Sequence, residues 1–214
     1  MKKTSSLIIA AIIALLCSQA KAQTLEETLS KAFTLFGNGK DMGPKMAASA
    51  QFDLAAGKWP DEWAANYYAA WSKAIISYNE PDKKRKDMLL DQADNYFEKV
   101  KSLNDKSDET FVLGALIANA RLSVDPSSRW KKYGDIFSEN LEKAKAINAD
   151  NPRIYYLKGV SLFYTPAAFG GGRKKAKEYL EKAKPLFAKQ DKSSILKPYW
   201  GEFQCDDYLK QCGE

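Results

Sequence analysis

The segment AKEYLEKAK, residues 176–184, carries the pattern that decides the fold. Its two alanines and its leucine are separated by steps of four and three residues. Such steps place the apolar side chains on one side of an α-helix and leave Glu and Lys on the other. The related phrases FEKVK and LEKAK occupy residues 97–101 and 141–145. Because no comparable stretch alternates with a period of two, we expect an all-α fold without strands.

The recurrence of this phrase at intervals of 44 and 39 residues indicates repeated helical hairpins. In each unit the phrase follows another apolar helix. One hairpin cannot bury its apolar faces alone, whereas stacked neighbours can. Unrelated amphipathic helices, the alternative, would produce such phrases by chance. We predict an α-solenoid of stacked antiparallel hairpins with additional N- and C-terminal helices, its units lying near residues 60–104, 107–149 and 151–190.

Turn-forming residues mark where the predicted helices begin. Pro60, Pro126 and Pro152 can each occupy a first helical turn, where the missing N–H costs nothing. Asp125 and Asn151 precede two of these prolines and can cap the helices that follow. The predicted helices lie near residues 24–36, 43–57, 60–79, 83–104, 108–123, 129–148, 152–164 and 173–190, with a further helical segment after residue 194.

Residues 1–22 have the features of a secretory signal peptide. Two lysines precede an unbroken apolar run over residues 7–16, and residues 20–22 fit an A-x-A cleavage site. The run is too short for a membrane-spanning helix, which needs about 20 residues. A short membrane anchor and a lipoprotein modified at Cys17 are the alternatives. We therefore predict an exported protein, periplasmic or extracellular, with one domain over residues 23–214 and no membrane span after cleavage.

Net charge narrows the classes of partner. The chain carries a net charge of +6, which falls to +3 without residues 1–22 because these contain three lysines and no acidic residue. A nucleic-acid-binding protein normally shows a denser basic stripe. The basic runs at residues 83–86 and 173–175 fit solvent-exposed helix starts instead. We therefore expect no nucleic-acid partner.

The chain contains no histidine. This excludes Ser-His and Cys-His nucleophile pairs and histidine-ligated metal sites. Asp206 and Asp207 do not offer paired carboxylates, because adjacent residues on a helix point about 100° apart. We therefore predict no enzymatic activity, no metal and no cofactor.

Cys205 and Cys212 are the two cysteines of the predicted mature chain. An even number of cysteines in an exported protein suggests one disulfide. Seven residues along a straight helix separate Cα atoms by roughly 10 Å, whereas a disulfide needs about 4.4–6.8 Å. If the bond forms, the chain must turn between the two cysteines.

Small and large residues recur at matched positions in the two helices of each unit. In the first helix, Gly114 follows Leu113 in the middle unit, and Gly159 takes the same place in the last. In the second helix, residues 176–183 follow the pattern A-x3-L-x2-A. These positions resemble tetratricopeptide repeats, whose pattern is W-x2-L-G-x2-Y in the first helix and A-x3-F-x2-A in the second.

The resemblance covers residues 60–190, where the units are longer than the usual repeat of about 34 residues. The last unit is also similar to exported repeat proteins of the TRAP-transporter T-component type. More broadly, it resembles exported helical repeat proteins of Bacteroidetes-like bacteria. The resemblance implies a binding protein whose groove is lined by the first helix of each hairpin.

Aromatic residues concentrate at the start of the first predicted hairpin. Trp63, Tyr67 and Trp71 are spaced by four residues and therefore lie along one side of a helix. If that side lines the groove, rigid aromatic side chains there would capture a peptide or an apolar ligand. The alternative is that they form the hairpin core, because neighbouring alanines leave space that only large side chains fill.

The run Gly170-Gly171-Gly172, followed by Arg173, is a second candidate site. Its backbone N–H groups could bind an anion at the start of a helix, although the G-K-[ST] ending of a phosphate-binding loop is missing. The alternative is a tight connection between helices that needs positive φ.

Together these features predict a passive binding protein. The first hypothesis is a helical-repeat scaffold outside the cytoplasm that engages a protein or peptide partner through a preformed groove. The second is an accessory component of solute uptake that binds a small ligand in or near that groove. An enclosed cavity with convergent polar groups would favour the second hypothesis, and a shallow open groove the first.

Overall fold

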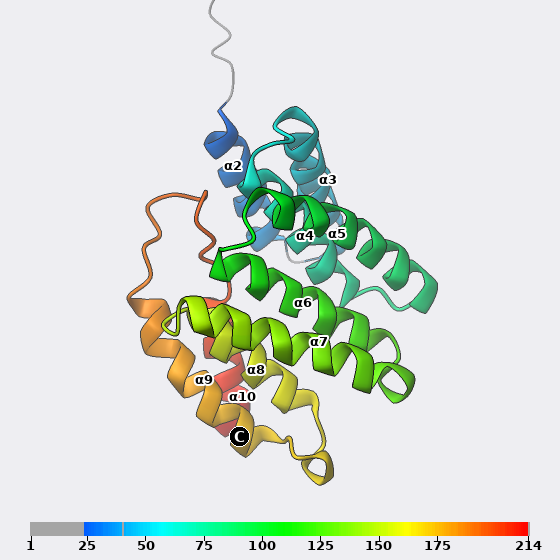
Figure 1. Cartoon of the computed structure of the whole chain (residues 1–214), viewed down its shortest axis with the longest axis vertical. Helices are drawn as coiled ribbons and strands as arrows, with labels where there is room; N and C mark the ends of the chain where they lie inside the picture. The colour runs from blue at the N-terminus through cyan, green and yellow to red at the C-terminus, as the bar shows by residue number, and fades with distance from the viewer. Residues whose placement is uncertain (1–23, 40, 214) are drawn as a thin grey trace, which may run out of the picture.

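The computed structural model describes residues 24–39 and 41–213, and all regular secondary structure within these residues is helical (Figure 1). The all-α prediction is therefore confirmed, whereas the predicted signal peptide lies outside the described residues. The elements in chain order are α2 (Leu25–Asn38), α3 (Met42–Lys58), α4 (Trp63–Ser77), α5 (Lys83–Leu103), α6 (Asp108–Val124), α7 (Pro126–Ile147), α8 (Pro152–Tyr164), the short 3-10 helix η1 (Ala167–Phe169), α9 (Arg173–Ala188) and α10 (Glu202–Gly213).

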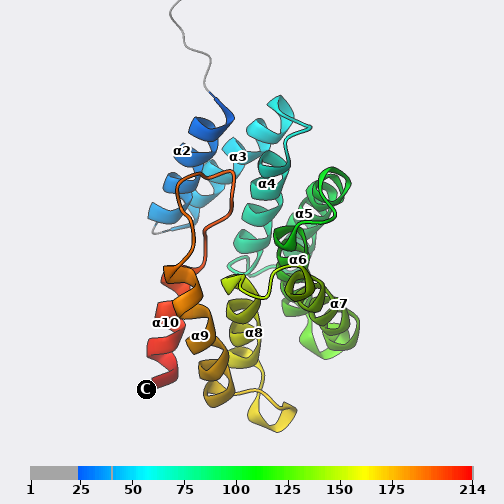
Figure 2. The same ribbon diagram turned by 60° about the vertical axis from the view of Figure 1, so that its left-hand side comes forward.

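Neighbouring helices pack as hairpins, and the hairpins stack in a row. α4 packs against α5, α6 against α7 and α8 against α9. The first helices of these pairs also contact one another, α4 with α6 and α6 with α8. Figures 1 and 2 show this row, with α2 and α3 before it and α10 beside α9. The predicted stacked hairpins, with additional helices at both ends, are thus confirmed.

The helix starts follow the predicted turn chemistry with two exceptions. α8 begins as expected, with the Asn151 side chain capping it and a proline in its first position. Pro60 lies in the connection before α4 rather than in its first turn, because α4 begins only at Trp63. Asp125 precedes α7 without capping its backbone, because its carboxylate accepts a hydrogen bond from the Ser127 hydroxyl at 2.9 Å.

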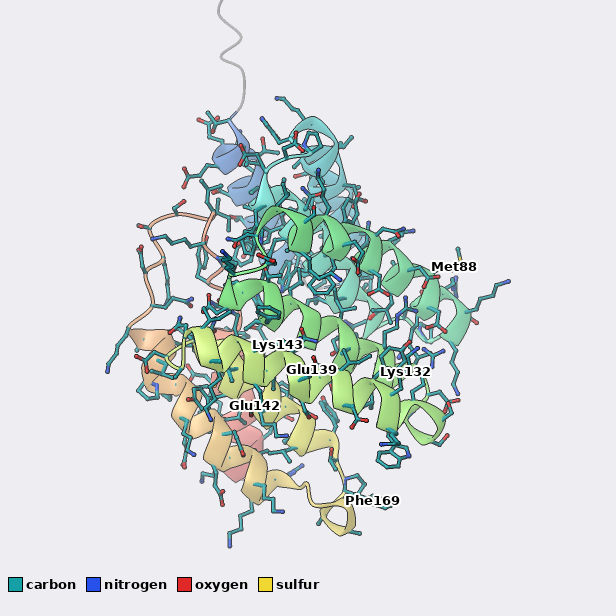
Figure 3. All side chains as sticks on the ribbon, in the orientation of Figure 1. Met88, Lys132, Glu139, Glu142, Lys143 and Phe169 are labelled. Atoms are coloured by element: carbon teal, nitrogen blue, oxygen red, sulfur yellow. The ribbon has the colours of Figure 1, made fainter. Side chains whose placement is uncertain are left out.

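Burial differs between the two helices of a hairpin. In α4 every residue from Ala64 to Ala74 is buried, so this helix lies inside the protein. In α7 the buried residues are Phe137, Leu141 and Ala144, which form one stripe. Figure 3 shows the charged side chains that α7 turns to solvent, Lys132, Glu139, Glu142 and Lys143. The first helices therefore build the core, and the second helices form the solvated outer layer.

Two glycines allow neighbouring helices to approach closely, one within a hairpin and one between two hairpins. A Cβ at Gly159 in α8 would lie 2.7 Å from Cγ of Leu180 in α9, and one at Gly114 in α6 would lie 2.7 Å from the Phe97 ring in α5. Carbon atoms clash at such distances, so a larger residue must push the helices apart. The close packing of the helices thus explains why the repeat-like pattern has a small residue at this position.

We expect Gly159→Ala to lower the free energy of unfolding by about 1–3 kcal/mol, because the added methyl group overpacks the contact between α8 and α9. The matched control is Gly57→Ala in α3, where an added Cβ meets nothing within 4 Å. Higher helix propensity should make this control more stable, by up to about 1 kcal/mol. Urea unfolding followed by circular dichroism measures both variants. Equal stability of the two would contradict the close packing.

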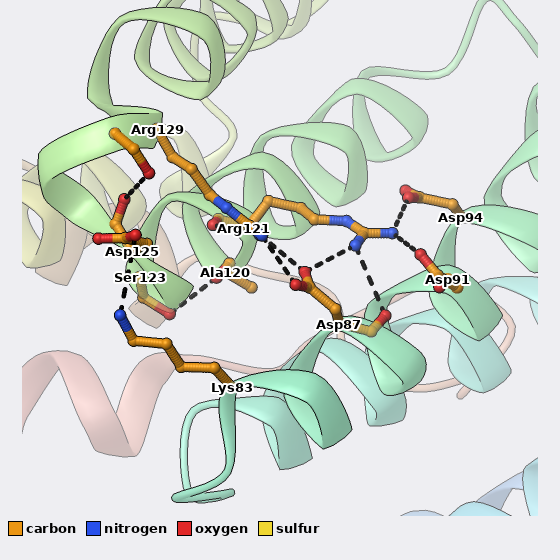
Figure 4. Close-up of polar contacts among 10 residues, drawn as sticks. Lys83, Asp87, Asp91, Asp94, Ala120, Arg121, Ser123, Asp125 and Arg129 are labelled. Carbon is orange, nitrogen blue, oxygen red and sulfur yellow. Dashed lines mark hydrogen bonds and ion pairs between the residues drawn. The ribbon is translucent and has the colours of Figure 1, made fainter.

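An arginine clasp joins the α4–α5 hairpin to the α6–α7 hairpin (Figure 4). Arg121 of α6 donates hydrogen bonds to Asp91 and Asp94 of α5 at 2.5 and 2.6 Å, and to Asp87 at 3.0 Å. Arg129 of α7 donates to both carboxylate oxygens of Asp87 at 2.7 Å. These hydrogen bonds, above all those from Arg129, lower the pKa of Asp87. One network of charges therefore holds three helices.

The arginine clasp should make stability depend on pH in the acidic range. The pKa of Asp87 lies below its ordinary value of 3.8 in the folded protein, so its stabilising contribution is complete above the unfolded pKa and is lost as the pH falls through the folded pKa. We expect Asp87→Asn to be less stable than the wild type at pH 7, and the difference in unfolding free energy to shrink as the pH falls below 3.8. Urea unfolding across this range measures it.

Asp105→Asn, in the exposed connection between α5 and α6, is the matched control for charge removal. It should show a smaller difference from the wild type at pH 7. If the difference in unfolding free energy between Asp87→Asn and the wild type stayed constant from neutral to acidic pH, the ionised carboxylate would not be the group that stabilises the clasp.

Candidate functional sites at the two ends of the helices

A buried ion pair lies where α6 and α8 begin. Arg153, in the first turn of α8, donates from Nε to both carboxylate oxygens of Glu109, each at 3.0 Å. The Arg153 side chain is 2% exposed and that of Glu109 is 11% exposed. Burying charges is costly unless they are paired and their remaining hydrogen bonds are made. The neighbours of this pair are therefore as important as the pair itself.

Four neighbouring residues complete the hydrogen bonds of the ion pair. Asn151 and Tyr67 donate to the glutamate at 2.5 and 3.2 Å. The arginine donates to the Gln190 side chain at 3.1 Å and to the backbone carbonyl of Trp200 at 3.2 Å. Burial and the adjacent carboxylate raise the pKa of Tyr67, so its hydroxyl stays protonated. The network joins α4, α6 and α8 to the segment that follows α9.

This segment, residues 190–201, connects α9 to α10, and we call it the strap. Figure 2 shows it passing beside α2 on its way to α10. Its Trp200 donates from the indole N–H to the Tyr67 hydroxyl at 2.9 Å, and its ring centre lies 6.1 Å from that of Trp71. Tyr199 packs edge-to-face against Phe33 of α2. A non-helical part of the chain itself thus occupies the inner side of α4.

The structure places most of the predicted aromatic site in the core. Tyr67 is completely buried and Trp71 is 5% exposed, and both contact Trp200 of the strap. The alternative interpretation of these two residues as core is therefore the one that the structure supports. Trp63 differs from them, because it is partly exposed and lines a surface cleft. Its indole N–H donates to the Thr110 hydroxyl at 3.0 Å.

The cleft lies beside the buried ion pair and has a volume of about 580 Å³. The starts of α4, α6 and α8, the ends of α5, α7 and α9, and the strap all contribute to its walls. Acidic, amide and basic side chains predominate in the lining, among them Asn104, Asp108, Asp150 and Lys189. We call it the polar cleft.

The glycine run does not form the predicted anion site. The backbone N–H groups of Gly170, Gly171 and Gly172 all donate to carbonyl oxygens of residues 162–167, so the chain itself already uses them. Gly170 and Gly172 have φ values of +84° and +104°, which favour glycine. The alternative prediction, a tight connection between helices, is confirmed.

The predicted disulfide between Cys205 and Cys212 is not formed. Both cysteines are free and lie on the uninterrupted helix α10, with no turn between them. A straight helix keeps their Cα atoms roughly 10 Å apart. The Cys205 thiol instead donates to the carbonyl oxygen of Leu180 in α9 at 3.5 Å, and burial raises its pKa to about 12. It acts as a packed core residue.

Four aromatic residues gather on the opposite side of the molecule from the polar cleft, where α4 and α8 end beside α10. The hydroxyls of Tyr164 and Tyr208 are 3.0 Å apart. The ring centre of Phe163 lies 5.2 Å from that of Tyr208 in an edge-to-face contact. Tyr78, directly after α4, interacts electrostatically with both tyrosines. We call these four residues the tyrosine face.

The tyrosine face is partly open to solvent. Tyr164 is 69% exposed and Tyr78 is 37% exposed. Burial nevertheless raises the pKa of Tyr78 and of Tyr208. The hydroxyls of Tyr78 and Tyr208 therefore stay protonated at neutral pH.

The basic residue Arg173 borders the tyrosine face. The Arg173 guanidinium, part of the predicted anion site, lies 5.6 Å from the ring centre of Phe163. Arg173 and Lys177 also act together on the thiol of Cys212, where they oppose the rise of its pKa that burial causes. Aromatic rings and positive charge are therefore combined in one region.

A solved structure, the HusA haemophore from Porphyromonas gingivalis, resembles nearly the whole chain. Its sequence is 32% identical, the similarity covers 91% of this chain and 94% of that chain, and the TM-score is 0.75. The chain belongs to the family of this haemophore. No protein-family model and no curated protein matches the chain.

This relationship supports only part of the family resemblance that the sequence suggested. It supports a helical protein of the Bacteroidetes type, but not the assignment to tetratricopeptide repeats or to the T-component type. Among the residues that the structure describes, no helix is long and apolar enough to cross a membrane. The same residues contain no group of cysteine and carboxylate side chains that could hold a metal ion.

The sequence analysis missed the ion pair and the tyrosine face. One signal for the pair was present, because Arg153 lies in the first turn of a helix, where the helix dipole disfavours a cation. Such a residue needs a carboxylate nearby, and Glu109 starts the preceding hairpin. For the tyrosine face, the doublet Phe163-Tyr164 stands at the very end of a helix. Its partner Tyr208, however, is 44 residues away from Tyr164 in the sequence.

We expect Arg153→Leu to destabilise the protein by about 3–5 kcal/mol, because it leaves the Glu109 carboxylate buried without its partner. Adding Glu109→Gln to this variant should restore part of the loss, since no unpaired charge remains. The control is Lys192→Leu, which removes an exposed ion pair with Glu202 and should cost less than about 1 kcal/mol. Urea unfolding compares the variants, and a loss for Arg153→Leu no larger than for the control would contradict the importance of the pair.

Proposed function

We propose that this protein is an exported carrier that captures haem, and that the tyrosine face holds the haem. The observation that carries the proposal is the 32% identity, over 91% of the chain, with a protein described as a haemophore. A haemophore captures haem, and its relatives are the first candidates for the same ligand. The predicted signal peptide agrees with capture outside the cytoplasm.

The tyrosine face fits the shape and charge of haem. Haem is a flat aromatic macrocycle with two carboxylate groups at one edge. Phe163, Tyr164 and Tyr208 offer rings against which the macrocycle can pack. Arg173, whose guanidinium lies beside the Phe163 ring, can pair with a carboxylate of a ligand packed there. The polar cleft fits haem less well, because Trp63 is the one aromatic side chain among the described residues that line it, whereas the tyrosine face groups four aromatic rings.

The chemistry of the residues favours binding through the macrocycle rather than through the iron. The chain has no histidine to serve as an axial ligand. Ring packing and pairing of the carboxylates would therefore provide most of the affinity.

In this proposal the protein acts by passive capture and performs no catalysis. The second hypothesis from the sequence, binding of a small ligand during solute uptake, is closer to haem capture than the first. A protein or peptide partner, the first hypothesis, has no comparable support. The strap occupies the inner side of α4, where such a partner was expected to bind.

Haem titration of the mature protein, followed by the Soret absorbance band, tests the proposal. We expect the double variant Tyr164→Ala, Tyr208→Ala to bind haem at least about fivefold more weakly, because it loses two aromatic contacts of about 0.5–1.5 kcal/mol each. The matched control is Trp130→Ala, which removes a 63% exposed aromatic side chain from α7, a helix that contributes no residue to the tyrosine face. Its affinity for haem should stay unchanged.

A second titration with protoporphyrin that lacks iron distinguishes the two modes of binding. Similar affinities for haem and for the iron-free macrocycle would support capture through the rings. Loss of binding without iron would show that an axial ligand dominates. Equal haem affinity in the wild type and in the double tyrosine variant would refute the assignment to the tyrosine face, and no saturable binding of haem by the wild type would refute the proposed function.

A further inference from the structure

We infer that the polar cleft is a second binding site, and that its ligand is a neutral polyhydroxylated molecule such as a sugar. The inference does not rest on the proposed capture of haem. The cleft lies at the start of α8, whereas the tyrosine face lies at the end of this helix. Its volume of about 580 Å³ falls within the range of about 300–1,000 Å³ that is usual for small-molecule sites.

Several charged groups in the cleft are already paired or hydrogen-bonded. Glu109 is held by Arg153, and Lys197 lies 3.5 Å from Asp191. Asp108 accepts hydrogen bonds from the amide groups of two neighbouring asparagines through one carboxylate oxygen. A strongly charged ligand would have to compete with these contacts. A neutral ligand that forms hydrogen bonds can leave them in place.

Several polar groups of the lining retain hydrogen-bonding capacity. Among the described residues, no hydrogen bond or ion pair is found for the Asp150 carboxylate, the Lys189 ammonium group or the Ser107 hydroxyl. The Asn104 side chain accepts one hydrogen bond through its oxygen, which leaves its NH₂ group available. Acceptors and donors thus line one cleft together. A ligand hydroxyl both donates and accepts, so several hydroxyls on one molecule can use both kinds of group.

Trp63 supplies the apolar surface that completes such a site. Its indole is fixed, because the indole N–H donates to Thr110 at 3.0 Å and the ring packs against Tyr67 with centres 4.7 Å apart. The partly exposed ring lines the cleft beside the polar groups. A sugar ring has an apolar face of C–H groups and a rim of hydroxyls. It can therefore place its face on the indole and its hydroxyls on the polar side chains.

The alternatives fit less well. A simple anion would meet the carboxylates of Asp108 and Asp150, and Arg153 is already used by Glu109. A zwitterion such as an amino acid would need a free cation and a free anion at a fixed separation, yet Lys189 and Asp150 are exposed and belong to different connections. An apolar ligand would leave most of the lining without hydrogen bonds. A neutral polyhydroxylated ligand avoids all three problems.

The test is a titration of the mature protein, followed by two-dimensional proton–nitrogen NMR spectra. The probes are glucose, galactose, N-acetylglucosamine, lactose and cellobiose, with glycine and inorganic phosphate as charged comparisons. We expect at least one sugar to shift the indole N–H signal of Trp63 and the amide signal of Asp150 in a saturable manner, with a Kd on the order of 1 mM or lower. Glycine and phosphate should not shift these signals.

Two variants connect the binding to the cleft. Asp150→Ala should weaken sugar binding about threefold to tenfold, through the loss of hydrogen bonds to a charged acceptor. Asp135→Ala on the outer side of α7 is the matched control, because its exposed ion pair with Lys131 contributes little to stability; sugar affinity should not change. Haem titration of Asp150→Ala should match the wild type, which separates this site from the tyrosine face.

Three results would overturn the inference. The first is the absence of saturable shifts with every sugar at concentrations well above 1 mM. A Kd of 1 mM corresponds to only about 4 kcal/mol of binding free energy. The second is tighter binding of glycine or phosphate than of any sugar, which would identify a charged ligand. The third is unchanged sugar affinity in Asp150→Ala, which would place the binding outside the polar cleft.

Discussion

The buried ion pair between Glu109 and Arg153 fixes how the last two hairpins and the strap lie relative to one another. The helix dipole favours Glu109 at the start of α6 and disfavours Arg153 at the start of α8, so the arginine is stable there mainly because its partner is close. Low polarity around the pair strengthens the attraction and makes any unpaired charge costly. The guanidinium also donates to Gln190 and to the Trp200 carbonyl. One side chain thereby sets both the packing of α8 on α6 and the path of the strap.

The fixed strap explains why the aromatic stretch of α4 is buried rather than available to a ligand. Tyr67 and Trp71 contact Trp200 of the same chain, where the sequence suggested a peptide or an apolar ligand. This packing has a cost, because the Tyr68 hydroxyl and the Trp71 indole N–H are buried without hydrogen-bond partners among the described residues. The large apolar area that the aromatic cluster buries offsets the cost of these two unpaired polar groups. With the inner side of α4 occupied, binding is left to the two ends of the helices.

The sequence predicted what depends on local order along the chain. Apolar periodicity gave the helices to within a few residues, and the Pro152 and Asn151 signals gave the start of α8. Contacts between distant residues were not predictable in this way. Trp200 reaches Tyr67 across 133 positions, and no local pattern indicates such a pairing. The proposed disulfide failed for a related reason, because the spacing of Cys205 and Cys212 allowed either a turn or a helix, and packing against α9 selected the helix.

The fold separates the residues that stabilise it from those that are exposed to solvent. Arg153 lies at the start of α8 and Tyr164 at its end, eleven residues later, which corresponds to about 16 Å along a helix. The ion pair at the first end is largely buried and is hydrogen-bonded to its neighbours, so its residues cannot change singly without loss of stability. Tyr164, at the other end, is mostly exposed, and its substitution removes little buried area. A surface of this kind can adapt to a ligand while the network at the opposite end keeps the hairpins in place.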